Sequence, residues 1–267
     1  MKNSRKTIQR RQSKLLHYLE QNKTATVANL ASMLNVSPIT IRRDLDDLEK
    51  QKLVTRHFGG VKIVAGTQSG NETEYLHSTT QHLDCKQAIA RRAAELLSDG
   101  DIIFINSSAT ALMIYPYITA KVLIVTNNGR SLQVKRPPNV ELMLTGGEVS
   151  GSKQSLVGQF AVETLSSITA TKCILGVSGI SVEGGITSQV IEETTINRTM
   201  LRRCSGEKIV VAAHNKIGLE HNFFSSNLSD ITRLITDTGA DPAKLNKIRG
   251  AGIAVDVVEP LSSTKIG

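Results

Sequence analysis

Two patterns of hydrophobic and polar positions divide the chain. In residues 9–48 hydrophobic side chains recur every three or four positions, which is typical of amphipathic helices. Further along, short continuous hydrophobic runs alternate with helical stretches. The runs occupy residues 102–105, 122–125, 140–144, 173–177, 209–213, 233–236 and 254–258. Because buried parallel strands are hydrophobic on both faces, this second pattern predicts a parallel α/β sheet.

The first pattern predicts three helices. Their inward positions are Leu15, Leu16 and Leu19, then Val27, Leu30, Ala31 and Leu34, then Ile41, Leu45 and Leu48. A short turn through Asn35 and Val36 separates the second helix from the third. Ser37 is a suitable N-cap for the third helix, and Pro38 is a suitable first residue because its missing N–H costs nothing there.

The outward face of the third helix is basic and hydroxylated in its first half and acidic further along. That polarity suits a recognition helix whose first turns enter the major groove of DNA. The expected DNA-contacting residues of this helix are Ser37, Ile39, Thr40, Arg42 and Arg43. An arginine can bind a guanine edge or a phosphate, and Thr40 a base methyl group or a phosphate. The alternative is a helical hairpin that serves protein contacts.

Residues 53–63 predict two short strands around a tight turn, which is the wing of a winged helix-turn-helix domain. On this wing, Arg56 and His57 are expected to lie against the DNA backbone. Their alternative role is that of ordinary exposed polar side chains.

Charge is divided as unevenly as hydrophobicity. Residues 1–62 hold 13 Lys and Arg against 5 Asp and Glu, whereas residues 63–267 hold 19 of each, so the net charge of +8 arises in the first segment. Such a segment indicates a polyanionic partner, because neutralising phosphates releases their condensed counterions. Double-stranded DNA is therefore the expected partner. Aromatic residues make up only 3% of the chain, which disfavours stacking on single strands.

Residues 63–74 are rich in Gly, Ser and Thr and are the expected linker between a DNA-binding domain at 1–62 and an α/β domain at 75–267. Cys85, Cys173 and Cys204 form no CxxC pair, so we interpret them as reduced structural thiols rather than as a disulfide, a metal site or a nucleophile. The basic start precedes no hydrophobic signal segment, and no run is long enough to span a bilayer. A cytoplasmic protein with no membrane contact is expected.

Polar loops follow several predicted strands at their carboxyl ends, where ligands bind in parallel sheets. They comprise residues 106–110, 126–128, 145–147 and 214–216. Small hydroxyl residues, backbone N–H groups and a Lys are what an anionic phosphate requires. Taken singly, each such loop more often reflects ordinary turn chemistry than a ligand site.

The segment SPITIRRDLDDLEKQKLVTRHFGG, residues 37–60, resembles the recognition helix and wing of the DeoR family of bacterial sugar-metabolism regulators. In that family S-x-x-T-I-R-R-D-L and R-x-x-G-G recur at this spacing; Lys52 departs from the pattern, since Gly is common there. The resemblance continues through residues 145–148, 155–158, 175–180, 183–187, 198–200, 214–218 and 235–237, and so covers nearly the whole chain. It implies a larger α/β domain that resembles ribose-phosphate isomerases and senses a phosphorylated sugar.

The resemblance also implies effector-binding residues by position. The family's D-x-G-S/T-T loop falls on Asn106, Ser107, Ser108, Ala109 and Thr110, and its A-D-H/S-S/T-K motif falls on residues 212–216, ending at Lys216. The expected set is completed by Asn127, Gly146 and Gly147.

This chain departs from both effector motifs. Asn106 and Ala213 replace acids, Ser108 replaces a glycine and Ala109 a hydroxyl residue. The Asn side chain can accept a hydrogen bond but carries no charge, and the Ala side chain has neither an acceptor nor a charge. Losing two carboxylates also removes repulsion toward an anion, so phosphate binding stays possible.

Three neighbouring residues leave alternatives open. Lys216 is expected to meet a phosphate, or else to be an exposed surface Lys. Arg198 is equally suited to an ion pair with Glu192 or Glu193. His214 is interpreted as a loop histidine with satisfied hydrogen bonds rather than as a catalytic base.

Three functions accommodate these features. The preferred one is a repressor of a carbohydrate-utilisation operon, a homodimer or homotetramer that a phosphorylated sugar releases from operator DNA. The second is a sugar-phosphate isomerase with a DNA-binding appendage, but isomerisation needs a carboxylate, and two expected acids are absent at Asn106 and Ala213. The third is a DNA-binding regulator with an effector-blind second domain. We therefore expect no enzymatic activity, metal or cofactor.

Overall fold

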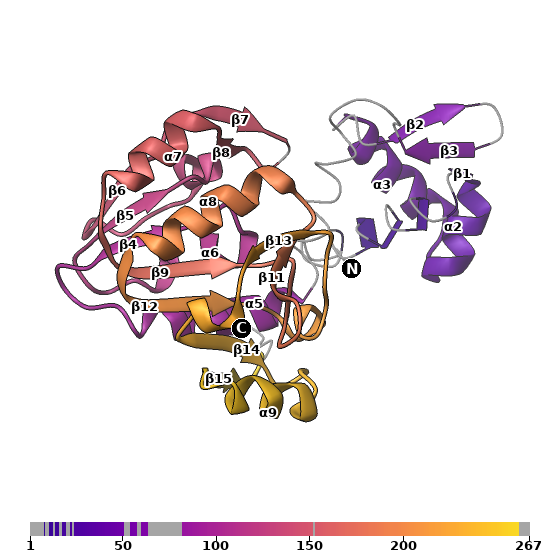
Figure 1. The fold of residues 1–267 in the computed structure, drawn as a ribbon. Helices are drawn as coiled ribbons and strands as arrows, with labels where there is room; N and C mark the ends of the chain where they lie inside the picture. The colour runs from indigo at the N-terminus through magenta and orange to yellow at the C-terminus, as the bar shows by residue number, and fades with distance from the viewer. Residues whose placement is uncertain are drawn as a thin grey trace. The chain divides into compact units, whose positions relative to one another are not determined.

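The computed structural model describes residues 8, 11, 12, 14, 15, 18, 19, 22, 24–50, 54–57, 60–63, 82–151 and 153–261. The chain divides into two compact units, Met1–Gln81 and His82–Gly267, and Figure 1 shows the fold of each. The linker expected at 63–74 lies outside the described residues except for Ile63, which ends a strand. Within the described residues, no helix is both long and hydrophobic enough to cross a bilayer.

Helices α2 (Val27–Leu34) and α3 (Pro38–Lys50) of the amino-terminal unit are the predicted second and third helices. The side chain of Thr26 caps α2, and Asn35 ends it in the left-handed conformation, which Asn tolerates better than most residues. Ser37 precedes α3, as predicted. Of the first predicted helix, at 9–20, the structure describes residues 11, 12, 14, 15, 18 and 19, and all six are helical.

The predicted wing is confirmed as an antiparallel hairpin of β2 (Val54–His57) and β3 (Gly60–Ile63). A two-residue strand that was not predicted, β1 (Thr24–Ala25), pairs with the other side of β3, so the sheet order is β1-β3-β2. Two residues are too few to show a hydrophobic period, which is why the sequence gives no sign of β1.

The core of the amino-terminal unit follows the predicted inward positions. Its buried hydrophobic residues are Leu15, Leu19, Ala25, Leu30, Ala31, Ile41, Leu45, Leu48, Val54 and Val61. One charged side chain is also buried on α3: Asp44 is 2% exposed. It binds the guanidinium of Arg11 through two hydrogen bonds, and the second, from Nη2 to Oδ1, measures 2.8 Å. This ion pair ties the segment before α2 to α3.

The larger unit contains the predicted parallel sheet, so the α/β fold class is confirmed (Figure 1). The strand order is β15-β14-β12-β9-β4-β5-β6, and every pairing is parallel. The strands are β4 (Ile102–Ile105), β5 (Val122–Thr126), β6 (Val140–Leu144), β9 (Ala170–Gly176), β12 (Cys204–Val211), β14 (Arg233–Asp237) and β15 (Ala254–Val258).

Alternate residues of each central strand enter two hydrophobic cores, one on each face of the sheet. On β4, Ile103 and Ile105 join one core and Phe104 the other. The first core is covered by α5 (Leu83–Ala94), α6 (Ala109–Leu112) and the 3-10 turn η1 (Tyr115–Tyr117). The second is covered by α7 (Gln159–Ser166), α8 (Ile191–Arg202) and α9 (Pro242–Gly250). Both faces are therefore buried, as continuous hydrophobic runs require.

Two small antiparallel sheets lie outside the main sheet and were not predicted. One joins β10 (Gly179–Ser181), β11 (Gly185–Ser188) and β13 (Phe223–Ser226), and the other pairs β7 (Glu148–Ser150) with β8 (Ser155–Val157). The remaining 3-10 turns are η2 (Gly129–Gln133), η3 (His214–Lys216) and η4 (Leu228–Asp230). Strands of three or four residues are difficult to distinguish from loops by periodicity alone.

Candidate nucleic-acid interface and ligand crevice

The exposed face of α3 carries most of the residues predicted to contact DNA. The Ile39 side chain is 60% exposed, and Arg42 and Arg43 are exposed beside it. Ser37 accepts a hydrogen bond from the N–H of Thr40 at 3.3 Å, and the two hydroxyl groups lie 2.9 Å apart. The helix start is therefore fixed by its own side chains, and the two arginines project from its first turns.

Arg56 of the wing is bound to α3. Its guanidinium pairs with Asp46 and with Glu49, the latter at 3.4 Å, and donates to the backbone carbonyl of Arg42 at 3.0 Å. It thereby braces β2 against the helix and offsets the acids of the helix's second half. His57 pairs with Gly60 across the hairpin, and its side chain lies outside the described residues.

The carboxyl ends of the parallel strands gather the predicted effector residues at one edge of the main sheet. Chain order runs from β4 outward to β5 and β6, and then returns to the other side of β4 with β9 and β12. The order therefore reverses between β4 and β9, and ligands of open α/β sheets bind at such switch points. Asn106 follows β4, Asn127 follows β5, Gly146 follows β6 and Lys216 follows β12.

Asn106 joins the two strands on either side of this switch point. Its Nδ2 donates to the Gly176 carbonyl at 2.8 Å and to Oδ1 of Asn197 at 2.9 Å, and its Oδ1 accepts from the N–H groups of Gly176 and Ser108 at 3.0 and 3.3 Å. The side chain is 4% exposed. An aspartate could accept two of these bonds but could not donate the other two. Asn106 is thus a structural link rather than an uncharged copy of a sugar-binding acid.

Ser108 shapes the loop that follows Asn106. Its Oγ accepts from the N–H groups of Thr110 and Ala111 at 3.2 and 3.4 Å, which caps the short helix α6. A Cβ on Gly176 would lie 1.7 Å from this Oγ, so only Gly fits there. Ser107 in this loop is buried, and so is Thr110 in α6, which begins at Ala109 directly after the loop.

Asn127 presents a buried acceptor without a described partner. Its Nδ2 donates to the Leu156 carbonyl at 3.1 Å, whereas its Oδ1 has no hydrogen bond although the residue is 1% exposed. Buried polar atoms are normally satisfied, so this oxygen at the carboxyl end of β5 has an unused capacity to accept a hydrogen bond. Gly146 and Gly147 lie in the loop after β6, the next strand of the sheet. Their φ angles of +70° and +108° are ones that glycine adopts readily and other residues rarely do.

The carboxyl end of β12 holds a cluster of ionisable groups. Asp237 accepts from the N–H of His214 at 2.8 Å, and its other oxygen lies 2.7 Å from Nδ1 of the same histidine. Burial raises the pKa of Asp237, but hydrogen bonds from the backbone of His214 and Gly239 and from the imidazole outweigh burial and lower that pKa. The interpretation of His214 as a hydrogen-bonded loop histidine is confirmed.

Lys86 on α5 belongs to this cluster and was missed from the sequence. It is 6% exposed, and burial, followed by the charge of Lys216, lowers its pKa to about 8. Lys216 follows a predicted strand and Lys86 lies near the start of a predicted helix, so no local sequence motif connects them. Only the fold, in which α5 packs on β14 and β12, brings them together.

Two family models match this chain. The model of the DeoR-like helix-turn-helix domain matches residues 11–67, and the model of the DeoR C terminal sensor domain matches residues 81–238. The chain belongs to the DeoR family. It is therefore a DNA-binding transcriptional regulator, and we call its larger unit the sensor unit. The resemblance of residues 37–60 and of the later motifs is confirmed.

Curated relatives align with this regulator over nearly its whole length. The HTH-type transcriptional regulator GolR of Listeria innocua is 29% identical over 93% of this chain and 98% of its own. The HTH-type transcriptional repressor GlcR of Bacillus subtilis is 30% identical over 92% and 94%. The glycerol-3-phosphate regulon repressor of Escherichia coli is 27% identical over 85% and 90%.

Two solved structures are similar to this chain at low sequence identity. The sorbitol operon regulator SorC of Klebsiella pneumoniae is 14% identical with a TM-score of 0.37, over 92% of this chain and 96% of its own. Ribose 5-phosphate isomerase of Methanocaldococcus jannaschii is 12% identical with a TM-score of 0.37, over 51% and 54%.

The alternative of an ion pair between Arg198 and Glu192 or Glu193 is wrong. Arg198 on α8 instead donates to the backbone carbonyls of Ser225 and Phe224 at 3.2 and 3.3 Å. Glu193 binds Lys153 at 2.8 Å. Carbonyl groups of β13 attract the guanidinium because α8 packs directly on that strand, a contact between segments that are distant in sequence.

Asn106→Asp is expected to destabilise the regulator by about 2–3 kcal/mol near neutral pH, because it removes two donors and leaves a buried charge beside two acceptors. Those acceptors raise the pKa of the new carboxyl in the folded protein above its unfolded value. The penalty therefore shrinks as pH falls through the folded pKa, where the protonated carboxyl can donate again. Urea unfolding of variant and wild type at neutral and mildly acidic pH measures both effects.

Asn246→Asp on the exposed face of α9 is the matched control and should leave the urea midpoint unchanged. An Asn106→Asp variant as stable as wild type at neutral pH would show that the amide does not act as this link.

Proposed function

We propose that this regulator represses a carbohydrate-utilisation operon and leaves its operator when a phosphorylated sugar binds the sensor unit. The observation that carries the DNA half of the proposal is the exposed basic start of α3, with Arg42 and Arg43 on a helix held by a buried core. Relatives named as repressors, GlcR and the glycerol-3-phosphate regulon repressor among them, support repression, and the latter name points to a phosphorylated small molecule. A DNA-binding regulator of this kind acts in the cytoplasm and needs no enzymatic activity.

In the proposed complex, α3 lies in the major groove. Its contacts come from Ser37, Ile39, Thr40, Arg42 and Arg43. Arginine is suited to guanine because its planar fork matches two acceptors on the base edge. Arg56 also positions the wing, because it is bound to Asp46 and Glu49. The contacts of Arg56 and His57 with the DNA backbone stay predictions.

The proposed effector crevice lies over the carboxyl ends of β4, β5, β6 and β12. Lys86 and Lys216 supply positive charge for a phosphate, and the charge of Lys216 disfavours protonation of Lys86 until an anion binds. Asn127 supplies a buried acceptor for a sugar hydroxyl. The loop from Ser107 to Thr110 and the glycines 146 and 147 line the remainder. Asn106 is assigned to structure rather than to ligand.

We also propose that the regulator is a homodimer or a tetramer built from dimers, because paired recognition helices read paired half-sites. Three large hydrophobic side chains are exposed near β7 and β8: Leu132 at 68%, Val149 at 68% and Phe160 at 74%. Hydrophobic side chains this exposed are candidates for a contact with a partner. A second copy of the sensor unit is the proposed occupant.

Changing Arg42 and Arg43 together to Ala is expected to weaken operator binding at least tenfold, since each direct base contact is worth about 1–3 kcal/mol. Binding is measured by fluorescence anisotropy on a DNA fragment selected from a random pool by the wild-type protein. Lys121→Ala with Lys135→Ala removes the same charge from exposed positions of the sensor unit and serves as the control. Unchanged affinity in the Arg42 and Arg43 variant would refute the assignment of α3.

Inorganic phosphate and sugar phosphates are expected to bind more tightly at about pH 7 than at about pH 9, because Lys86, with a pKa of about 8, loses its charge over that interval. Lys86→Met should remove most of this pH dependence, and Lys216→Met should weaken binding at both pH values. Isothermal titration calorimetry measures the affinities, with Lys121→Met as the control. Equal affinity at both pH values would contradict the assigned lysine pair.

Thermal-shift measurements across a panel of sugar phosphates extend this test, since a ligand at 100 times its Kd stabilises a protein by about 2.7 kcal/mol. A panel without any stabilising member would favour an effector-blind sensor unit.

Replacing Val149 and Phe160 together by Asp is expected to give a monomer, because two charges would be buried in the proposed contact. Both side chains are exposed in the single chain, so little folding stability is lost. Sedimentation velocity compares this variant with wild type and with the control Leu219→Asp, another exposed hydrophobic position. A monomeric wild type, or an unchanged size in the double variant, would overturn this interface.

A further inference from the structure

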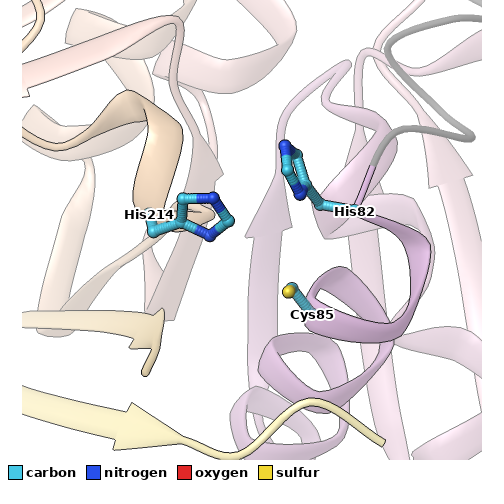
Figure 2. Close-up of side chains that lie close together, drawn as sticks. All are labelled: His82, Cys85 and His214. Atoms are coloured by element: carbon cyan, nitrogen blue, oxygen red, sulfur yellow. The ribbon is translucent and has the colours of Figure 1, made fainter. Parts of the chain in front are cut away.

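Three side chains with metal-binding atoms converge at the carboxyl end of β12. His82 and Cys85 come from the start of α5, and His214 faces them from η3 (Figure 2). One ring nitrogen of each histidine and the Cys85 sulfur all lie within 4.8 Å of one another. The two imidazole rings meet edge to face with centroids 4.4 Å apart.

We propose that His82, Cys85 and His214 bind a Zn²⁺ ion. Imidazole nitrogen and thiolate sulfur are the ligands that Zn²⁺ prefers, and three protein ligands leave a fourth tetrahedral position open. With Zn–N bonds of about 2.0–2.1 Å and Zn–S bonds of about 2.3 Å, bound ligand atoms stand roughly 3.5 Å apart. Each pair of these atoms therefore needs to close by about 1.3 Å at most, from 4.8 Å to roughly 3.5 Å, through side-chain rotation.

Local structure aims both α5 ligands at the same point. His82 precedes the helix and Cys85 lies in its first turn, three positions along, so the two side chains share a face. His82 adopts the left-handed conformation with φ of 53° and makes no side-chain capping bond. Its ring lies against His214 instead of on the helix end. The spacing His-x-x-Cys is a signal that sequence analysis overlooked when it treated Cys85 as a structural thiol.

Asp237 completes the arrangement as an outer partner. It lies 2.7 Å from Nδ1 of His214, so it can hold that nitrogen as a donor and leave Nε2 free as a ligand. A carboxylate behind a ligating histidine is the usual way of fixing ring orientation and tautomer in zinc sites. The same Asp237 also accepts from the backbone of His214 and Gly239, so its position does not depend on the metal.

The charged groups around the cluster determine what the fourth ligand is. Asp237 and Asp84 are the acids that act on Cys85, and Lys86 and Lys216 are the bases that act on His82. Burial and the proximity of His214 lower the pKa of His82, and Asp237 acts on it in the opposite direction. Binding replaces the thiol proton of Cys85, which leaves to solvent. With two ammonium groups alongside, the fourth ligand is an anion or a hydroxide.

Metal titration of the intact, chelator-treated regulator tests this proposal without any sugar phosphate or DNA. Co²⁺ is expected to bind one ion per chain and to give a near-ultraviolet sulfur-to-cobalt charge-transfer band. Zn²⁺ should displace it, since Zn²⁺ binds such sites more tightly. Cys85→Ala should abolish the band. Loss of a residue that only hydrogen-bonds to a metal ligand weakens metal binding roughly 10–100-fold. His214→Ala removes a ligand itself and should weaken Zn²⁺ binding by more than that.

Cys204→Ala, at a buried cysteine outside the cluster, is the control and should keep the band. Circular dichroism and melting temperature establish that each variant is folded. The absence of stoichiometric binding, or a band that survives in Cys85→Ala, would overturn the proposal.

A measurement on the wild-type protein covers the case in which a variant does not fold. Zn²⁺ at saturation should slow alkylation of Cys85 by iodoacetamide at least tenfold, roughly the factor by which the fraction of metal-free Cys85 thiol falls. Cys173 and Cys204 in the same digest serve as internal references. Equal rates at Cys85 with and without Zn²⁺ would refute the site. Because the probe is the metal alone, this outcome is independent of whether the regulator responds to a sugar phosphate.

Discussion

The hydrogen-bonded link between Asn106 and Gly176 is the constraint on which the sensor unit depends. One buried amide side chain, using both its donor and its acceptor, holds β4 beside β9 where the strand order reverses. The close approach of Ser108 then requires a glycine at 176, and the Ser108 hydroxyl sets the start of α6. The course of the loop after β4 follows from these contacts, because a side chain at 176 would collide with Ser108.

A small number of ion pairs also fixes the arrangement of the DNA-binding unit. Asp44 is buried against Arg11, and Arg56 lies on Asp46 and Glu49, so charges of opposite sign connect α3 to the segment before it and to the wing after it. Such pairs contribute geometry more than net stability, since desolvation offsets much of their attraction. Arg42 and Arg43 are exposed on the same helix. The surface of α3 is therefore basic because Asp44, Asp46 and Glu49 are paired within the unit while these two arginines are exposed, and not because of composition alone.

The sensor unit places several polar and ionisable groups at one edge of its main sheet. A buried amide oxygen on Asn127, a lysine with a lowered pKa at 86 and a histidine-cysteine cluster at the end of β12 all lie at carboxyl ends of strands or on the helix packed against them. Parallel topology explains this concentration, because every strand ends at the same edge and its loop needs no pairing of its own. An anion and a divalent cation would be neighbours there, and each would lower the electrostatic cost of the other.

Periodicity and charge by themselves determined the helix-turn-helix, the wing, the seven parallel strands and the basic character of residues 1–62, because each depends on neighbours within one turn or one strand. They did not determine which loop residues work on ligand and which on structure. Asn106 was placed in the effector site, Arg198 was offered an ion pair, and Cys85 was treated as inert. Only tertiary structure brings Gly176 to Asn106, β13 to Arg198 and His214 to Cys85, because a side chain's role is set by partners that folding delivers from distant segments.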